Sequence, residues 1–93
     1  MVAVNCELQD RIVNTFGAEI QSTICMEECA ELIQAISKMK RGKDNRDNLI
    51  EEMADVLIAF TQLRVIYGVT DDELIKWLAA KQDRQRRLLY GGK

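Results

Sequence analysis

The segment Ala18–Lys40, AEIQSTICMEECAELIQAISKMK, decides the fold class of this chain. Its apolar residues recur at intervals of three and four, the spacing that lines one face of an α-helix. Gly42 follows two residues later, where a glycine commonly ends a helix. The segment therefore predicts a long amphipathic helix.

Two further helices are predicted toward the ends of the chain. A short one is expected from about Cys6 to Phe16, where Gly17 interrupts the apolar pattern. The last one opens with Thr70-Asp-Asp-Glu73, a capping box in which the threonine and glutamate side chains satisfy exposed backbone amides reciprocally. It should run to about Leu89.

The remaining helix is apolar on nearly all sides and runs from about Leu49 to Tyr67. The polar stretch before it, 41–48, is the central loop, and Asn48 with Glu51 resembles a capping arrangement. The start of the helix could fall anywhere between Asp44 and Leu49. A helix of this kind must be buried on several sides, and a 93-residue chain has too few other elements to cover it. We therefore expect a homo-oligomer, either a dimer or a tetramer.

Composition agrees with an all-α class. The chain has no proline, five glycines and only 5% aromatic residues, while 47% of its residues are hydrophobic. Such a composition suits long helices better than turn-rich β architecture. We expect one domain, residues 1–93, built as a helical bundle of one short and three longer helices. Its centre is an antiparallel hairpin, and oligomerisation completes it.

Charge and cysteine content limit the compartment and the partners. The formal net charge of −2 gives no general attraction to nucleic acid, and no apolar run approaches the length of a membrane span. Three cysteines without C-x-x-C spacing or histidine indicate neither disulfides nor zinc, but small buried hydrophobes in a reducing compartment. A cytoplasmic protein is expected, with neither membrane nor nucleic acid as partner.

Four acidic residues stand where a helix should be apolar. At about 100° per residue, Glu28 and Glu31 fall within the apolar arc of their helix, and Glu52 with Asp55 faces packing on the next. Their pair midpoints lie at similar separations before and after Gly42. In an antiparallel hairpin both pairs would reach the same level, about 18 Å from the turn. The four carboxylates should then converge.

Converging carboxylates need a positive partner, because ionised groups buried together repel one another. Oxygen ligands without histidine or thiolate suit Mg²⁺, with Mn²⁺ also possible. Mg²⁺ keeps several waters and is commonly completed by substrate phosphates, so the pattern favours phosphate chemistry.

These acids also carry a family resemblance. Glu27-Glu28-Cys29-Ala30-Glu31 followed by Glu52-Met53-Ala54-Asp55 resembles the motifs of MazG-like nucleoside triphosphate pyrophosphohydrolases, members of the all-α NTP pyrophosphatase superfamily. The resemblance covers about 24–88. It implies that Glu28, Glu31, Glu52 and Asp55 bind Mg²⁺. It also implies hydrolysis of an NTP or dNTP to the monophosphate and pyrophosphate, as in housecleaning of nucleotide pools.

Further site residues are expected around this centre. The family's Lys-x-x-x-Asn on the last helix is similar to Lys81 through Gln85 here, so both are candidates for binding the nucleotide. Lys38 could reach phosphate from a neighbouring subunit, and Glu27 could orient or deprotonate the attacking water. The alternative function is a catalytically silent helical scaffold or interaction module, in which the acids form interfacial salt bridges.

Overall fold

The computed structural model describes residues 3–91 and is all-helical over that range. No strand occurs among these residues, which confirms the predicted all-α fold class. The predicted short helix and three longer ones are all present: α1 (Cys6–Phe16), α2 (Ala18–Lys40), α3 (Arg46–Tyr67) and α4 (Asp71–Leu89).

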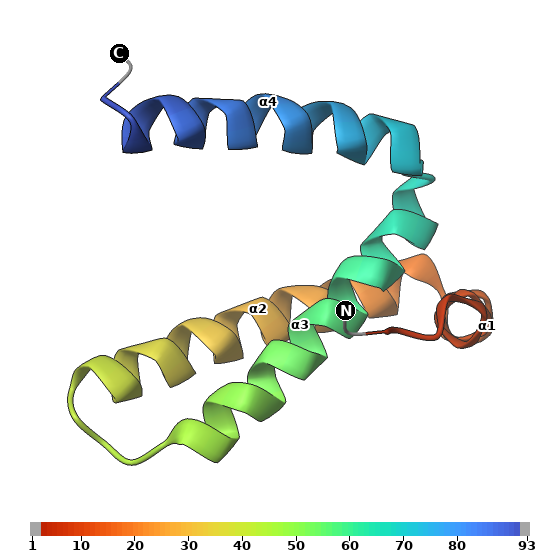
Figure 1. Ribbon diagram of the computed structural model, residues 1–93. Coiled ribbons are helices and arrows are strands. Elements are labelled where there is room, and N and C mark those ends of the chain that lie inside the picture. The colour runs from red at the N-terminus through yellow and green to blue at the C-terminus, as the bar shows by residue number, and fades with distance from the viewer. Residues whose placement is uncertain (1–2, 92–93) are drawn as a thin grey trace.

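Helices α2 and α3 form the antiparallel hairpin at the centre of the chain (Figure 1). Gly42 lies just beyond the end of α2 with a φ of +79°, a left-handed conformation that glycine adopts without strain. Its amide donates to the carbonyl oxygen of Met39 at 3.0 Å. The glycine therefore ends α2 and starts the reversal, as its place in the sequence predicts.

The capping arrangement predicted at Asn48 is wrong. Helix α3 begins at Arg46 with Asn45 as its N-cap, so Asn48 already lies inside the first turn. Its side chain donates to Glu52 four residues later. Several residues of the central loop are suited to start a helix, and the pattern alone did not select among them.

Helix α1 covers one end of the hairpin. A single residue, Gly17 with a φ of +96°, joins α1 to α2 and turns the chain sharply, so that α1 packs on both α2 and α3 (Figure 1). The buried hydrophobic core is small, namely Val13, Cys25, Ala35 and Ala59. Of the three cysteines only Cys25 is buried, so the prediction of buried cysteines is wrong for the other two.

Three glutamines join these helices in the interior. Gln62 on α3 donates its side-chain amide to Gln9 on α1 at 2.7 Å and accepts from Gln21 on α2 at 3.1 Å. All three side chains are buried. Because buried amides are stabilised only when hydrogen-bonded, this chain of contacts fixes how the three helices dock.

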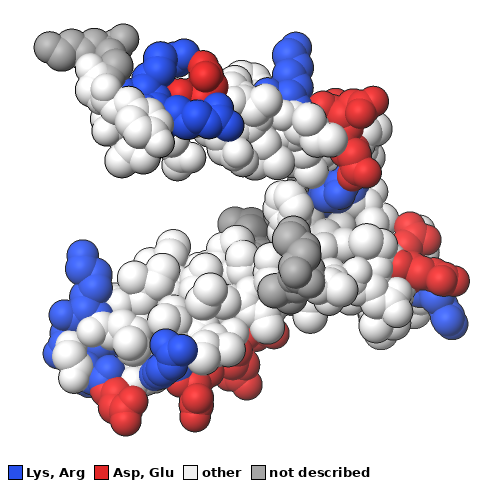
Figure 2. All heavy atoms as spheres, in the orientation of Figure 1, with Lys and Arg blue, Asp and Glu red and all other residues white. Residues whose placement is uncertain are grey.

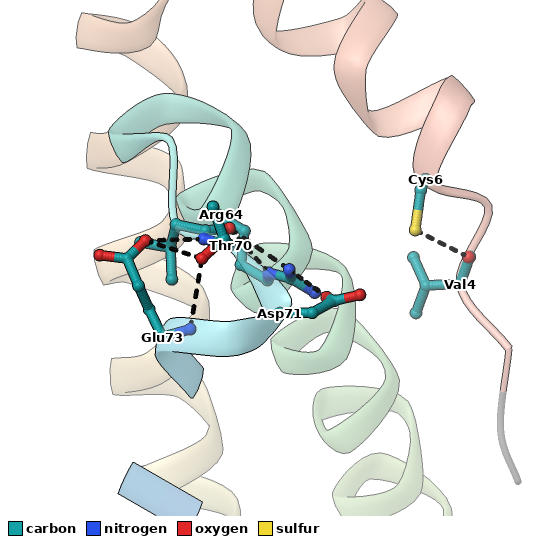
Figure 3. Close-up of polar contacts among 7 residues, drawn as sticks. Val4, Cys6, Arg64, Thr70, Asp71 and Glu73 are labelled. Carbon is teal, nitrogen blue, oxygen red and sulfur yellow. Dashed lines mark hydrogen bonds and ion pairs between the residues drawn. The ribbon is translucent and has the colours of Figure 1, made fainter. Parts of the chain in front are cut away.

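Helix α4 leaves the bundle at a firmly built corner. Gly68 ends α3 in the left-handed conformation, and Thr70 with Glu73 forms the predicted capping box. The Arg64 guanidinium donates to the Val69 carbonyl oxygen at 3.3 Å and pairs with Asp71 (Figure 3). Beyond this corner α4 packs against none of the other helices described, and Figure 2 shows open space between it and the hairpin.

Much apolar surface stays uncovered in the single chain. On α3, Met53 is 52% exposed and Phe60 is 46% exposed, although the sequence predicts burial on several sides. A single chain thus leaves α3 only partly covered. Within residues 3–91, none of the helices combines the length and apolar content needed to cross a bilayer.

Candidate metal centre

The register of α2 against α3 is set by contacts next to the acidic residues. Cys25 Sγ donates to the backbone carbonyl oxygen of Ala59 at 3.4 Å, and one turn away Gln21 pairs with Gln62. Because the helices are antiparallel, one turn closer to the hairpin turn the two acid pairs face each other. The register that the spacing around Gly42 predicts is therefore the one observed.

The structure brings all four predicted acids together. Glu28 and Glu31 on α2 and Glu52 and Asp55 on α3 each offer one carboxylate oxygen, and these four oxygens lie within 4.8 Å of one another. Opposite ligands of an octahedral Mg²⁺ stand about 4.2 Å apart, so small side-chain movements would allow one ion to bind all four. Glu52 is buried, while Glu31 is exposed in the single chain, less inward than the helical wheel predicts.

The cluster perturbs the titration of its own members. Burial, followed by the charges of Asp55 and Glu31, raises the pKa of Glu28 from 4.5 to about 7. Burial and contact with Glu31 likewise raise the pKa of Glu52. Both shifts have the sign expected when carboxylates lose water and approach other carboxylates. The negative charge gathered here is therefore held at a cost in stability.

No basic side chain compensates this charge within the described residues. The ion pairs found in 3–91 join Arg64 to Asp71 and Asp83 to two arginines of α4, away from the cluster. Glu28 Oε2 and Glu52 Oε2 are both buried without a hydrogen-bond donor. Buried acceptors are normally satisfied, so these oxygens fit a cation. The donor set, carboxylate oxygen alone, fits Mg²⁺.

Asn48 is a member of the site that the sequence reasoning did not identify. Its Nδ2 donates to Glu52 Oε1 at 3.3 Å, and its Oδ1 accepts from Asn45 at 3.1 Å. Such a contact would orient the carboxylate of Glu52 for an ion to which Asn48 itself does not bind. The signal was the four-residue spacing to Glu52, which places both side chains on one face of α3.

Glu27 does not join the cluster. It is exposed on α2 and is not among the acids whose oxygens meet. Its neighbour Glu28 turns inward because successive helical residues point about 100° apart. Its role as a base stays a prediction.

The predicted phosphate-binding residues lie apart from the acids. Lys81 and Gln85 are exposed on α4, where the Lys81 ammonium lies 5.8 Å from the centroid of the Trp77 ring. Lys38 is half-buried near the end of α2, beside the basic side chains that Figure 2 shows gathered over the hairpin turn. Because α4 packs on no other helix, the single chain does not bring Lys81 or Gln85 to the carboxylates.

Comparison with known proteins agrees with this geometry. A helical hairpin that faces four carboxylates across its interior is an arrangement that could hold a metal ion through oxygen ligands. The model of the MazG nucleotide pyrophosphohydrolase domain matches residues 17–87, so the chain belongs to the MazG family. Members of this family act on nucleoside triphosphates and are generally Mg²⁺-dependent. Searches of curated proteins and of solved structures found no match to the chain.

Proposed function

We propose that this protein is a Mg²⁺-dependent pyrophosphohydrolase that converts an NTP or dNTP to the monophosphate and pyrophosphate. Glu28, Glu31, Glu52 and Asp55 would hold the ion. The observation that carries the proposal is the convergence of four carboxylates around two buried oxygens that lack a donor. Acids with a purely structural role would be paired with basic residues, whereas these four have no ion pair within residues 3–91.

The metal site fits the chemistry of a triphosphate. Bound Mg²⁺ would neutralise phosphate charge and make a water molecule a better nucleophile. In the reaction, water oxygen bonds to the α-phosphorus while the bond from that phosphorus to the bridging oxygen breaks. Pyrophosphate leaves with the bonding electron pair, and a proton of the water passes to a base.

The side chains of the protein supply positioning and proton transfer. Asn48 donates to one oxygen of Glu52, and the other oxygen is buried without a hydrogen-bond donor. Lys81, Gln85 and Lys38 are proposed to bind the phosphates and the nucleotide, since their donors suit anionic oxygens. Glu27 is proposed as the base, because it is adjacent in sequence to a ligand and remains free to contact solvent.

We further propose that the whole chain acts as one domain in a homo-oligomer. The uncovered apolar surface of α3 supports this, because large contiguous apolar surfaces mark interfaces. The reaction would clear unwanted nucleotides from the cytoplasmic pool.

The test is pyrophosphate release from a panel of NTPs and dNTPs with Mg²⁺ and with a chelator. We expect release that requires Mg²⁺ and that Glu28→Gln abolishes, while Glu51→Gln, an exposed acid on the same hairpin, keeps it. Glu27→Gln should lower turnover without lowering Mg²⁺ affinity. If none of the NTPs and dNTPs released pyrophosphate, the result would favour the catalytically silent scaffold.

A further inference from the structure

The start of α3 holds an asparagine whose side chain does not cap the helix. Asn45 is the N-cap of α3, and its backbone carbonyl oxygen accepts from the Leu49 amide at 2.9 Å. Asparagine is among the best residues for this position, because its side-chain oxygen can accept from an exposed amide in the first turn. Among residues 3–91 the Asn45 side chain makes no such bond. The helix therefore begins without a stabilising contact that its own sequence could provide.

Helix α1 shows the same residue acting as a cap. Asn5 is the N-cap of α1, with an extended backbone at a ψ of 98°, and its side-chain oxygen accepts from the Leu8 amide at 2.9 Å. Leu8 is the third residue of α1, as Asn48 is the third residue of α3. Asn45 has a ψ of 23°, outside the extended region that is usual for an N-cap. The two asparagines thus occupy corresponding positions and use their side chains differently.

The Asn45 side chain contacts another side chain instead. Its Nδ2 donates to Oδ1 of Asn48 at 3.1 Å, and Nδ2 of Asn48 donates to Oε1 of Glu52 at 3.3 Å. Both asparagines are half-buried, and Glu52 is buried. The spacings of three and four residues place all three side chains on one face of the helix. Two consecutive hydrogen bonds therefore lead from the start of α3 to an acid of the cluster.

The carboxylate at the end of this path sets the direction of both hydrogen bonds. An ionised Glu52 can only accept, so Asn48 must present its NH₂ group to it. The side-chain oxygen of Asn48 then faces Asn45, which must in turn present its own NH₂ group. Because hydrogen bonds in series polarise one another, the donor at Asn45 also strengthens the bond at Glu52. A side chain that lacks a donor at the position of Asn45 Nδ2 could not replace this asparagine.

We propose that Asn45 is a positioning residue for the metal ligand Glu52 and that it acts through Asn48. The start of α3 stays without a side-chain cap because the Asn45 side chain makes this contact. The amide group of Asn48 is held at both ends, which restricts its rotation and that of the carboxylate it contacts. The inference rests on the proposed function only for Mg²⁺ as the ion that the four acids bind.

Replacing Asn45 by serine separates helix capping from positioning. Serine caps a helix about as well as asparagine, but its side chain ends one bond short of Nδ2 and adds no charge beside the acids. In chelator, the Tm of Asn45→Ser should equal or exceed that of the wild type. Its Mg²⁺ affinity by calorimetry should nevertheless fall about 3- to 10-fold, a modest loss because water can reach the half-buried site of Asn45. A Mg²⁺ affinity equal to that of the wild type would overturn the proposal.

A second variant tests the route through Asn48. If Asn45 acts only through this residue, then adding Asn45→Ser to Asn48→Leu should weaken Mg²⁺ binding no further than Asn48→Leu alone. A further loss equal to that of Asn45→Ser in the wild type would overturn the route. Asn5→Ser is the matched control, because it makes the same change at the N-cap of α1. It should leave the Mg²⁺ affinity unchanged.

Measuring ion binding apart from hydrolysis separates this inference from the proposed function. Mg²⁺ binding that weakens in Asn45→Ser, in a protein that releases no pyrophosphate from any NTP or dNTP, would refute the function and support the positioning role. Pyrophosphate release by the wild type, together with unchanged Mg²⁺ affinity in Asn45→Ser, would refute the positioning role and support the function. A wild type that binds no Mg²⁺ would refute both.

Discussion

Replacing Glu28 by glutamine should stabilise the metal-free protein while destroying its response to Mg²⁺. The pKa of Glu28 rises from 4.5 to about 7 in the folded chain. A difference of about 2.5 in pKa corresponds to about 3.4 kcal/mol in the free energy of unfolding for a fully buried group, and solvent screening of this partly exposed side chain lowers the value to about 1 to 2 kcal/mol. At pH 8 without metal, Glu28→Gln should therefore raise Tm by about 5 to 15 °C at fixed protein concentration.

The pH dependence has a definite sign. Because the folded pKa lies above the unfolded one, the folded state of the metal-free protein holds its proton more tightly. Stability is therefore highest below about pH 4.5 as far as this group is concerned, and it is lost as the pH rises through about 7. Burial raises the pKa of Glu52 as well, which acts in the same direction. Glu28→Gln should therefore make the stability of the metal-free protein depend less on pH.

The assay is thermal unfolding followed by circular dichroism, between pH 4.5 and 8, with a chelator or with saturating Mg²⁺. Mg²⁺ should stabilise the wild type because it binds only the folded state, and the variant should gain little. The order of thermal stability should therefore reverse: Glu28→Gln is more stable than the wild type without metal and less stable than the wild type with it. Glu51→Gln removes an exposed acid from the same hairpin and should follow the wild type throughout. The reasoning would be refuted if Glu28→Gln were less stable than the wild type in chelator, or if Mg²⁺ stabilised it as much as the wild type.

Three further predictions concern the supports of the site. Asn48→Leu should leave the helix content unchanged and weaken Mg²⁺ affinity about 10- to 100-fold by calorimetry, since Glu52 loses its donor; unchanged affinity would remove Asn48 from the site. Gln62→Leu should cost about 1 to 3 kcal/mol in urea unfolding, because two buried amides lose their partner, and a neutral effect would show that they find another. Thr70→Ala should lower the free energy of unfolding of the oligomer by about 1 kcal/mol through loss of the cap on α4, whereas Glu73→Gln, which can keep the reciprocal contact, should cost less.

Patterns within short stretches of sequence were sufficient to predict the helices and the convergence of the four acids. Apolar spacing, Gly42 and the capping box at Thr70 each act within a few residues, so their structural effect can be predicted without knowing the rest of the fold. The convergence of the carboxylates followed from equal separation on either side of one turn. The structure shows this convergence of the four carboxylates, whereas the binding of an ion there stays a prediction.

Features that depend on contacts between distant residues were not predictable in this way. The contact of Gln62 with Gln9 joins residues 53 positions apart, and nothing in either segment signals it. The direction of α4 depends on how Arg64 reaches the Val69 carbonyl oxygen, a contact made by the folded corner. Asn48 was misassigned because asparagine serves equally as a helix cap and as a donor within a first turn.

The buried glutamines have a consequence for the acidic centre. Repulsion between the carboxylates would be relieved if α2 slipped past α3 by one turn, about 5.4 Å, which would separate the two acid pairs. Such a slip would break the amide contacts of Gln62 and leave buried donors and acceptors without partners. The hydrogen bonds of Gln62, two helical turns from the carboxylates, therefore hold α2 and α3 in register despite the repulsion. The ligands are thus preorganised in the metal-free chain. Little of the chain then has to become ordered when the ion binds, so the affinity for the ion depends mainly on the carboxylates themselves.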